Sequence, residues 1–192
     1  MSKIRSLGVF CGSANGKNPA FIKAAYELGQ LLGKKGIRLI YGAGHTGMMG
    51  AVAEGALDAG GKVVGIINDL LQSREVQRLK LTELKVLPSM HVRKDAMFEA
   101  SDAFCVLPGG IGTLDEVFEI VTLKQIGENN KPIILYNAFG FWEPYRQIIN
   151  TLIQEGFVRP EHADLVTYVD SVDEILPAIE AELEKNEHKK AG

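Results

Sequence analysis

Cysteine is scarce in this sequence, and its scarcity narrows the classes of protein to consider. The chain has 192 residues but only two cysteines, Cys11 and Cys105. Their spacing suggests neither a metal site nor the disulfide framework of a small secreted domain. We therefore expect reduced thiols, a cytoplasmic location and no metal in the functional site.

The sequence also lacks an excess of positive charge. It contains 21 lysine and arginine residues against 24 aspartate and glutamate residues, which gives a formal net charge of -3 at pH 7. A protein that binds nucleic acid uses lysine and arginine to neutralise the phosphate backbone. The balance of charge therefore predicts no nucleic-acid partner.

Long apolar runs are missing as well. No run approaches the roughly 20 residues that a membrane-spanning helix needs. The N-terminal stretch MSKIRSLGVFCGS has a basic start, but too few apolar residues precede the turn formers for a signal peptide. We expect no membrane partner, and the length predicts one domain over residues 1–192.

What the sequence does contain is an alternation of short β-rich runs with helical stretches. The runs begin at Leu7, Ile37, Lys62, Leu84, Ala103, Pro132 and Leu165. Most are continuously apolar, which is typical of parallel strands covered on both faces. The stretches between them, such as FIKAAYELGQLL, repeat apolar residues at helical spacing. The pattern predicts an α/β fold with a parallel sheet and helices on both faces.

Two glycine-rich turns follow strands of this sheet. One lies in CVLPGGIGTLDEVFE and the other in YGAGHTGMMG. Glycine allows a ligand to approach the backbone closely, and the amino end of the following helix attracts anions. Two such turns at the carboxyl edge of one sheet predict a ligand with a phosphate and a further polar part, such as a mononucleotide. Each turn taken alone is also explained by simple turn chemistry.

The residues around the first turn allow two interpretations. We expect the next helix to begin near Thr113, where Thr113 and Glu116 have the spacing of a capping box. A capping box would explain both residues without any function, although not the acidic residues that crowd beside them. Upstream, Arg93 and Lys94 are either a solvated pair on a helix or two positive charges at the same sheet edge.

Taken together, these motifs resemble a known family. The sequence is similar to the Lonely Guy (LOG) proteins, cytokinin riboside 5′-monophosphate phosphoribohydrolases that were formerly mislabelled as lysine decarboxylases. The family signature P-G-G-x-G-T-x-x-E is met by residues 108–116, and M-x-x-R-K is met by residues 90–94. The stretches VFCGS, YGAGHTGMMG, SDAF, KPIILYN and EGFV extend the resemblance over nearly the whole chain.

The resemblance implies a Rossmann-like fold, a homodimer and an N-glycosidase. The implied reaction hydrolyses adenine-type nucleoside 5′-monophosphates, either cytokinin riboside 5′-monophosphates or AMP, to free base and ribose 5-phosphate without a cofactor. Arg93 and Glu116 would be the catalytic pair. The implied substrate-binding residues are Ser13, Gly44, Glu75, Met90, Arg93, Lys94, Gly109, Gly110, Ile111, Gly112, Thr113, Leu114, Asp115 and Thr122. The chain departs from the family at Ala43, where a third glycine is common, and at Ala14, where a second serine is common.

The chemistry suits these residue types. Cleavage builds positive charge on the ribose, which the Glu116 carboxylate could stabilise while it orients the attacking water. Arg93 could oppose negative charge on the departing base or hold the phosphate, and the sequence leaves both roles open. The alternative function is a nucleotide-binding sensor or carrier that uses the same pocket without catalysis.

Overall fold

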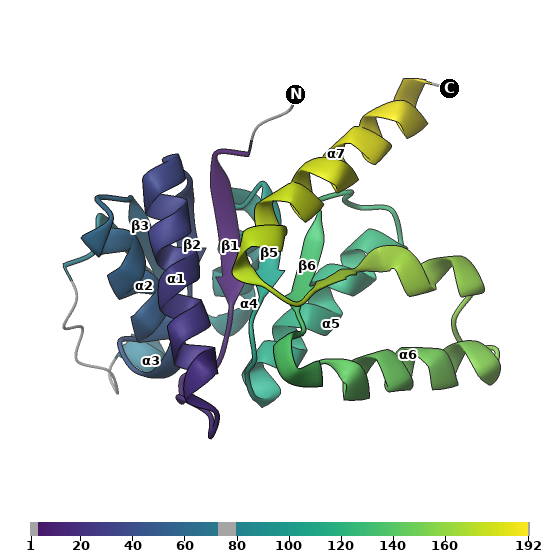
Figure 1. The fold of residues 1–192 in the computed structure, drawn as a ribbon, viewed down its shortest axis with the longest axis horizontal. Helices are drawn as coiled ribbons and strands as arrows, with labels where there is room; N and C mark the ends of the chain where they lie inside the picture. Colours follow the sequence, from purple (N-terminus) through teal and green to yellow (C-terminus); the bar gives the residue numbers. More distant parts are fainter. Residues whose placement is uncertain (1–3, 73–79, 192) are drawn as a thin grey trace.

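The computed structural model of the protein describes residues 4–72 and 80–191 (Figure 1). Its centre is a seven-stranded sheet in the order β4-β3-β2-β1-β5-β6-β7, and every neighbouring pair is parallel. The strands are β1 Ser6–Phe10, β2 Arg38–Tyr41, β3 Val63–Asn68, β4 Glu83–Leu87, β5 Ala103–Val106, β6 Ile133–Tyr136 and β7 Thr167–Val169. All seven coincide with the predicted runs, so the α/β, Rossmann-like fold is confirmed.

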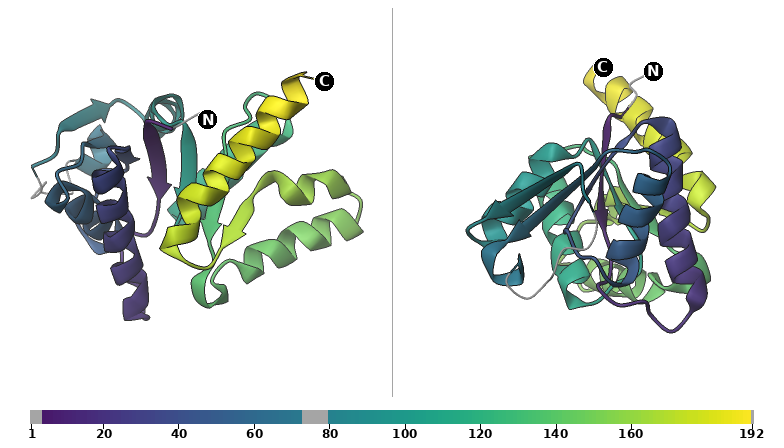
Figure 2. Two further views of the ribbon diagram at one scale, coloured as in Figure 1. Left: turned by 45° about the horizontal axis from the view of Figure 1, so that its top comes forward. Right: turned by 90° about the vertical axis from the view of Figure 1, so that its left-hand side faces the viewer.

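Helices cover both faces of the sheet, as Figures 1 and 2 show. They are α1 Pro19–Lys35, α2 Gly47–Asp58, α3 Asp69–Gln72, α4 Met90–Ala100, α5 Ile111–Gln125, α6 Glu143–Gln154 and α7 Ile175–Ala191, with 3₁₀ turns η1 Ala138–Gly140, η2 Pro160–Leu165 and η3 Val172–Glu174. Buried residues of α1, α2 and α7 form one core with the sheet, and those of α4, α5 and α6 form a second. Within the described ranges, no helix is both long and apolar enough to cross a membrane.

The first helix shows how local sequence sets the elements. Asn18 caps α1 by accepting a hydrogen bond from the Ala20 N–H at 3.0 Å, and Pro19 occupies the first helical position. Gly36 ends the helix in the left-handed conformation at φ 68°. At Gly29, a Cβ atom would overlap the backbone of Val52 in α2. The glycine therefore lets α1 and α2 approach to backbone contact.

One strand differs from the expectation that the runs are covered on both faces. β4 lies at the edge of the sheet, where it pairs with β3, and its residues Glu83 to Val86 are exposed. An edge position leaves the strand with a neighbour on one side only. Its mixture of charged and apolar residues is typical of an exposed edge strand.

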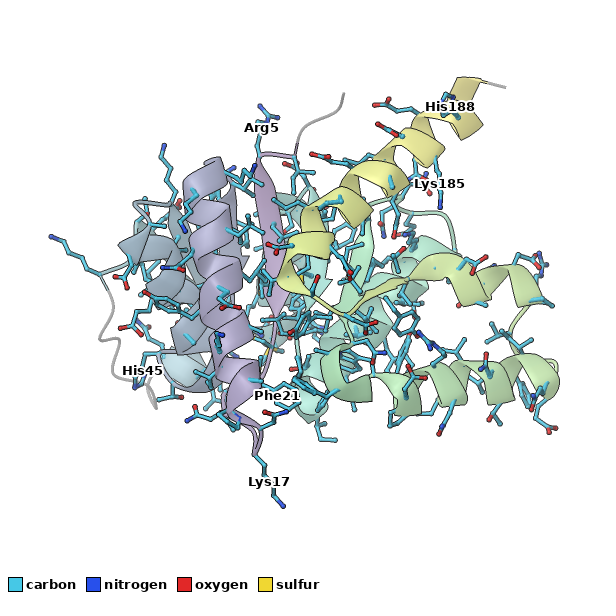
Figure 3. All side chains as sticks on the ribbon, viewed as in Figure 1. Arg5, Lys17, Phe21, His45, Lys185 and His188 are labelled. Carbon is cyan, nitrogen blue, oxygen red and sulfur yellow. The ribbon has the colours of Figure 1, made fainter. Side chains whose placement is uncertain are left out.

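The strand order has its switch point between β1 and β5. From β1 the chain first builds the sheet toward β4, and it then returns to add β5 on the other side of β1. In open α/β sheets, ligands bind outside the carboxyl ends of the strands at such a switch point. The loops after β1 and β5 meet there, because the Gly12 N–H donates to the Pro108 carbonyl at 3.0 Å. In Figure 3, Lys17 and Phe21 mark this edge, and Arg5 marks the opposite one.

Candidate active site

The amino end of α5 differs from the expected capping box. The helix begins at Ile111 with Gly110 as its N-cap, two residues earlier than predicted, and no side chain caps it. The box is wrong because Thr113 and Glu116 lie inside the helix and are both buried. The Thr113 side chain fills the space where a Cβ of Gly109 would stand. Gly109 therefore has to be a glycine, and the turn closes tightly onto the helix.

Glu116 faces Arg93 across the site instead of its own helix. The Arg93 Nη1 atom lies 3.2 Å from Glu116 Oε1, and both side chains are nearly fully buried. The Arg93 Nε donates to the Ile66 carbonyl of β3 at 3.0 Å, and Nη1 also contacts the Met90 sulfur at 3.1 Å. A Cβ at Gly42, after β2, would overlap the guanidinium. The interpretation of Arg93 as a solvated surface charge is therefore wrong.

Burial sets the protonation of Glu116. Removal from water raises the pKa of its carboxyl to about 7, although the neighbouring Arg93 acts in the opposite direction. Near neutral pH the group is therefore present in both charged and neutral forms. A carboxyl with this pKa, held by a fixed cation, is suited to acid and base chemistry.

Lys94 is buried beside this pair and forms ion pairs with two carboxylates that are more exposed. Its Nζ atom lies 3.1 Å from Asp115 Oδ2 and 3.0 Å from Glu119 Oε2, both on α5. Burial would lower the pKa of Lys94, but the hydrogen bonds to Glu119 and Asp115 outweigh it and the pKa is raised. Lys94 therefore remains an ammonium cation. It lines a shallow pocket of about 290 Å³ on the flank of α5, to which Thr122 also contributes.

The second glycine-rich turn is tied to the loop after β1. Thr46 Oγ1 donates to the Ser13 carbonyl at 3.1 Å, and the Met49 N–H donates to the Gly12 carbonyl at 3.3 Å. Gly44 is buried in this turn. Ala43 has a left-handed φ of 62°, a conformation that costs an L-residue about 1–2 kcal/mol. Such backbone strain is typical of functional turns.

The structure brings most of the predicted site residues to one edge of the sheet. Those in the loops that follow the strands, or in the first turns of the helices that begin there, are Ser13, Gly44, Met90, Arg93, Lys94, Gly109, Gly110, Ile111, Gly112, Thr113, Leu114, Asp115 and Glu116. Thr122 lies farther along α5, where its hydroxyl donates to the Phe118 carbonyl at 2.7 Å. Glu75 lies outside the described residues.

Sequence reasoning missed three contributors to this geometry. They are the Ile66 carbonyl, the glycine at position 42 and the second carboxylate that binds Lys94, Glu119. Two of them left a signal. Gly42 belongs to the second glycine-rich turn, and Glu119 follows Asp115 by four residues and so lies on the same face of α5. Among the described residues, no group of three or more histidine, cysteine, aspartate or glutamate side chains is placed to hold a metal ion.

Comparison with known proteins identifies the family that this chain matches. A family described as "Possible lysine decarboxylase" matches residues 49–179. Cytokinin riboside 5′-monophosphate phosphoribohydrolase LOG of Oryza sativa subsp. japonica is 37% identical over 179 residues, which are 93% of this chain and 74% of that protein. LOG3 of Arabidopsis thaliana, with the same activity in its name, is 37% identical over 93% of this chain and 83% of its own length.

Solved structures share the fold. A molybdenum cofactor binding protein from Rippkaea orientalis superimposes with a TM-score of 0.71 at 23% identity, over 95% of this chain and 99% of that chain. The Moco carrier protein of Chlamydomonas reinhardtii superimposes with a TM-score of 0.70 at 21% identity, over the same shares of the two chains. At these identities the likeness concerns the fold alone.

Proposed function

Because the chain belongs to the Lonely Guy (LOG) family of phosphoribohydrolases, we propose that it hydrolyses the N-glycosidic bond of adenine-type nucleoside 5′-monophosphates. The products are the free base and ribose 5-phosphate. Cytokinin riboside 5′-monophosphates and AMP are the substrates we propose. The observation that carries the proposal is the buried Arg93–Glu116 pair beside the glycine turn of residues 108–113.

Glu116 carries the reaction in this proposal. As the glycosidic bond breaks, positive charge develops on the ribose, and an ionised carboxylate nearby stabilises it. The same carboxylate accepts a proton from the attacking water, a task that matches a pKa of about 7. Arg93 holds the carboxylate in one orientation through its contact at 3.2 Å.

The phosphate of the substrate belongs at the amino end of α5. The first helical hydrogen bond there runs from the Leu114 N–H to the Gly110 carbonyl. The N–H groups at the start of a helix have no carbonyl partner within that helix, and the helix dipole favours an anion beside them. Gly110 and Gly112 are exposed, so a phosphate can reach this turn. Arg93 is thereby left to orient Glu116 and to oppose charge on the departing base.

Lysine decarboxylation, the activity in the family's description, does not suit this site. A pyridoxal-dependent decarboxylase attaches its cofactor to a lysine that must lose its proton to react. Lys94, the lysine beside the pair, has a raised pKa because it binds Glu119 and Asp115. Its ammonium group is held for charge pairing, which suits the binding of an anionic nucleotide better than covalent chemistry.

We also propose that the protein works as a cytoplasmic homodimer. Both cysteines are free and buried, as suits a reducing compartment. Large apolar side chains are exposed on α4, on α5 and at the C-cap of α5, namely Val92, Phe118 and Ile126. A second copy of the chain would cover them.

Replacement of Glu116 by glutamine tests the proposed activity. Glutamine keeps the shape but cannot be ionised, so the release of adenine from AMP should fall at least about 100-fold. Chromatographic measurement of adenine and ribose 5-phosphate gives the rate. The matched control is Glu99→Gln, which changes an exposed carboxylate of α4 and should leave the rate unchanged.

Two outcomes would contradict this proposal in different ways. Unchanged turnover by the Glu116→Gln protein would refute the assigned role of the carboxylate. Binding of AMP by the unmodified protein without any release of adenine would support the sensor or carrier instead. Isopentenyladenosine 5′-monophosphate, assayed beside AMP, would show which base the pocket prefers.

A further inference from the structure

Met90 is in direct contact with the catalytic arginine. It is the first residue of α4, one turn before Arg93, and its sulfur lies 3.1 Å from Arg93 Nη1. The same nitrogen lies 3.2 Å from Glu116 Oε1. A change at the sulfur atom therefore acts on the group that holds the Glu116 carboxylate.

Exposure separates Met90 from the other described methionines. Met48 and Met97 are buried, with 1% and 0% of their surface exposed. Met49 is partly buried against Gly42 and Gly44, whereas Met90 is 37% exposed. Met1 lies outside the described residues. Among the described methionines, Met90 is thus the most exposed in the single chain.

We propose that Met90 is a site of reversible oxidation that regulates the Arg93–Glu116 pair, an inference that rests on the proposed function. The oxidant is a hydroperoxide such as hydrogen peroxide. Its O–O bond breaks, one oxygen atom forms a bond to the Met90 sulfur, and the remaining oxygen leaves as water with both hydrogens. The thioether is oxidised to a sulfoxide and the peroxide is reduced, so no further reactant is needed.

The geometry explains why the added oxygen disturbs the pair. A hydrogen bond from Nη1 to a sulfoxide oxygen needs about 2.9 Å between nitrogen and oxygen alone. The present distance of 3.1 Å from nitrogen to sulfur has no room for an oxygen between them. Arg93 cannot retreat easily, because the Ile66 carbonyl and Gly42 hold its other sides. Either the Met90 side chain moves away from Arg93, or the guanidinium moves away from Glu116. In the first case Arg93 loses its contact with Met90, and in the second it loses its contact with Glu116.

Titration of the protein with hydrogen peroxide tests this inference. Mass spectrometry of the Met90 peptide follows the sulfoxide, and adenine release from AMP follows the rate. The rate should fall at least roughly tenfold as Met90 is oxidised, since displaced catalytic groups cost this much or more. A methionine sulfoxide reductase with a thiol should restore it, and saturating AMP during treatment should slow the oxidation.

Two variants make the test specific. Met90→Leu and Met49→Leu each remove one accessible thioether, and each is compared with its own untreated rate. The Met90→Leu protein should keep its rate under peroxide, whereas the Met49→Leu protein should lose activity like the unmodified chain. In the oxidised unmodified protein, the acid limb of the pH–rate profile should also move to higher pH, because Arg93 then lowers the pKa of Glu116 less.

The outcomes that would overturn this inference differ from those that would overturn the proposed function. Full conversion of Met90 to sulfoxide with an unchanged rate, or equal loss in the Met90→Leu protein, refutes regulation through Met90. Absence of adenine release from untreated protein refutes the hydrolase itself. In that case the affinity for AMP is measured in place of the rate. An equal loss of affinity in the peroxide-treated unmodified protein and the peroxide-treated Met90→Leu protein refutes Met90 as the site of regulation.

Discussion

At the scale of single residues, we expect the ion pair between Glu116 and Arg93 to govern how the proposed site responds to pH. The carboxylate is buried, and burial favours its neutral form. The arginine, fixed 3.2 Å away, favours the charged form. The pKa of about 7 is the balance of the two effects, so removing either one moves it.

The pH dependence of the rate follows from this balance. If ionised Glu116 is the active form, kcat/KM for AMP should rise with pH through a midpoint near 7 and level off above it. The phosphate of AMP loses its second proton near pH 6, and this titration adds a second pH-dependent limb to the profile of kcat/KM. Replacement of Arg93 by methionine separates the two limbs. The charge that lowers the pKa of Glu116 is then gone, so the Glu116 limb should move up by about one pH unit or more.

A limb that stays in place in the Arg93→Met protein would contradict the assignment. It would mean that the phosphate of the substrate, and not Glu116, sets the pH dependence. The Glu116→Gln protein provides the control, because its residual rate should lack the limb near pH 7.

Residue patterns predicted part of this site and missed the rest for a physical reason. Arg93 and Glu116 were identified through the family resemblance, while local spacing alone also allowed a solvated cation and a capping glutamate. The burial of Arg93 depends on a carbonyl in β3 and on the missing side chain at Gly42. Both lie far from Arg93 in the sequence, and a backbone carbonyl has no residue type to signal it.

At the scale of elements, α5 is proposed to serve two tasks. The N–H groups of its first turn have no side-chain cap, and its second turn carries Glu116 toward Arg93. The start of the helix was predicted two residues late, because T-x-x-E is a good capping pattern. Gly110 and the tight packing of Gly109 against Thr113 allow the helix to begin earlier. Strand positions were predicted better, since a buried parallel strand needs only a continuous apolar run.

The loop after β2 offers a test of the close packing around the arginine. A methyl group at position 42 would overlap the Arg93 guanidinium, so Gly42→Ala should displace it. We expect kcat/KM for AMP to fall roughly 10- to 100-fold while the protein stays folded by circular dichroism.

Comparison with the arginine variant decides whether this loss acts through Arg93. A double variant of Gly42→Ala with Arg93→Met should be no slower than Arg93→Met alone, because both changes remove the same contact. Additive losses would show that the methyl group acts on something else, such as the loop backbone at Ala43.

At the scale of the whole molecule, the exposed apolar side chains of α4 and α5 predict a dimer. Light scattering in dilute solution should give about twice 20.9 kDa. Phe118→Asp places a charge on this surface and should shift the protein toward the monomer. Leu84→Asp, at an equally exposed apolar position on β4, should leave the dimer intact. A monomer at all concentrations of the unmodified protein would contradict the proposal.

The bond from Arg93 Nε to the Ile66 carbonyl has a consequence for how this protein tolerates mutation. The acceptor is part of the main chain, so no substitution of the Ile66 side chain removes the oxygen atom itself. Any apolar residue that preserves the path of β3 preserves the anchor. Substitutions at position 66 therefore leave the anchor of Arg93, the proposed catalytic arginine, in place, and the sequence around β3 can diverge among relatives without a compensating change at Arg93.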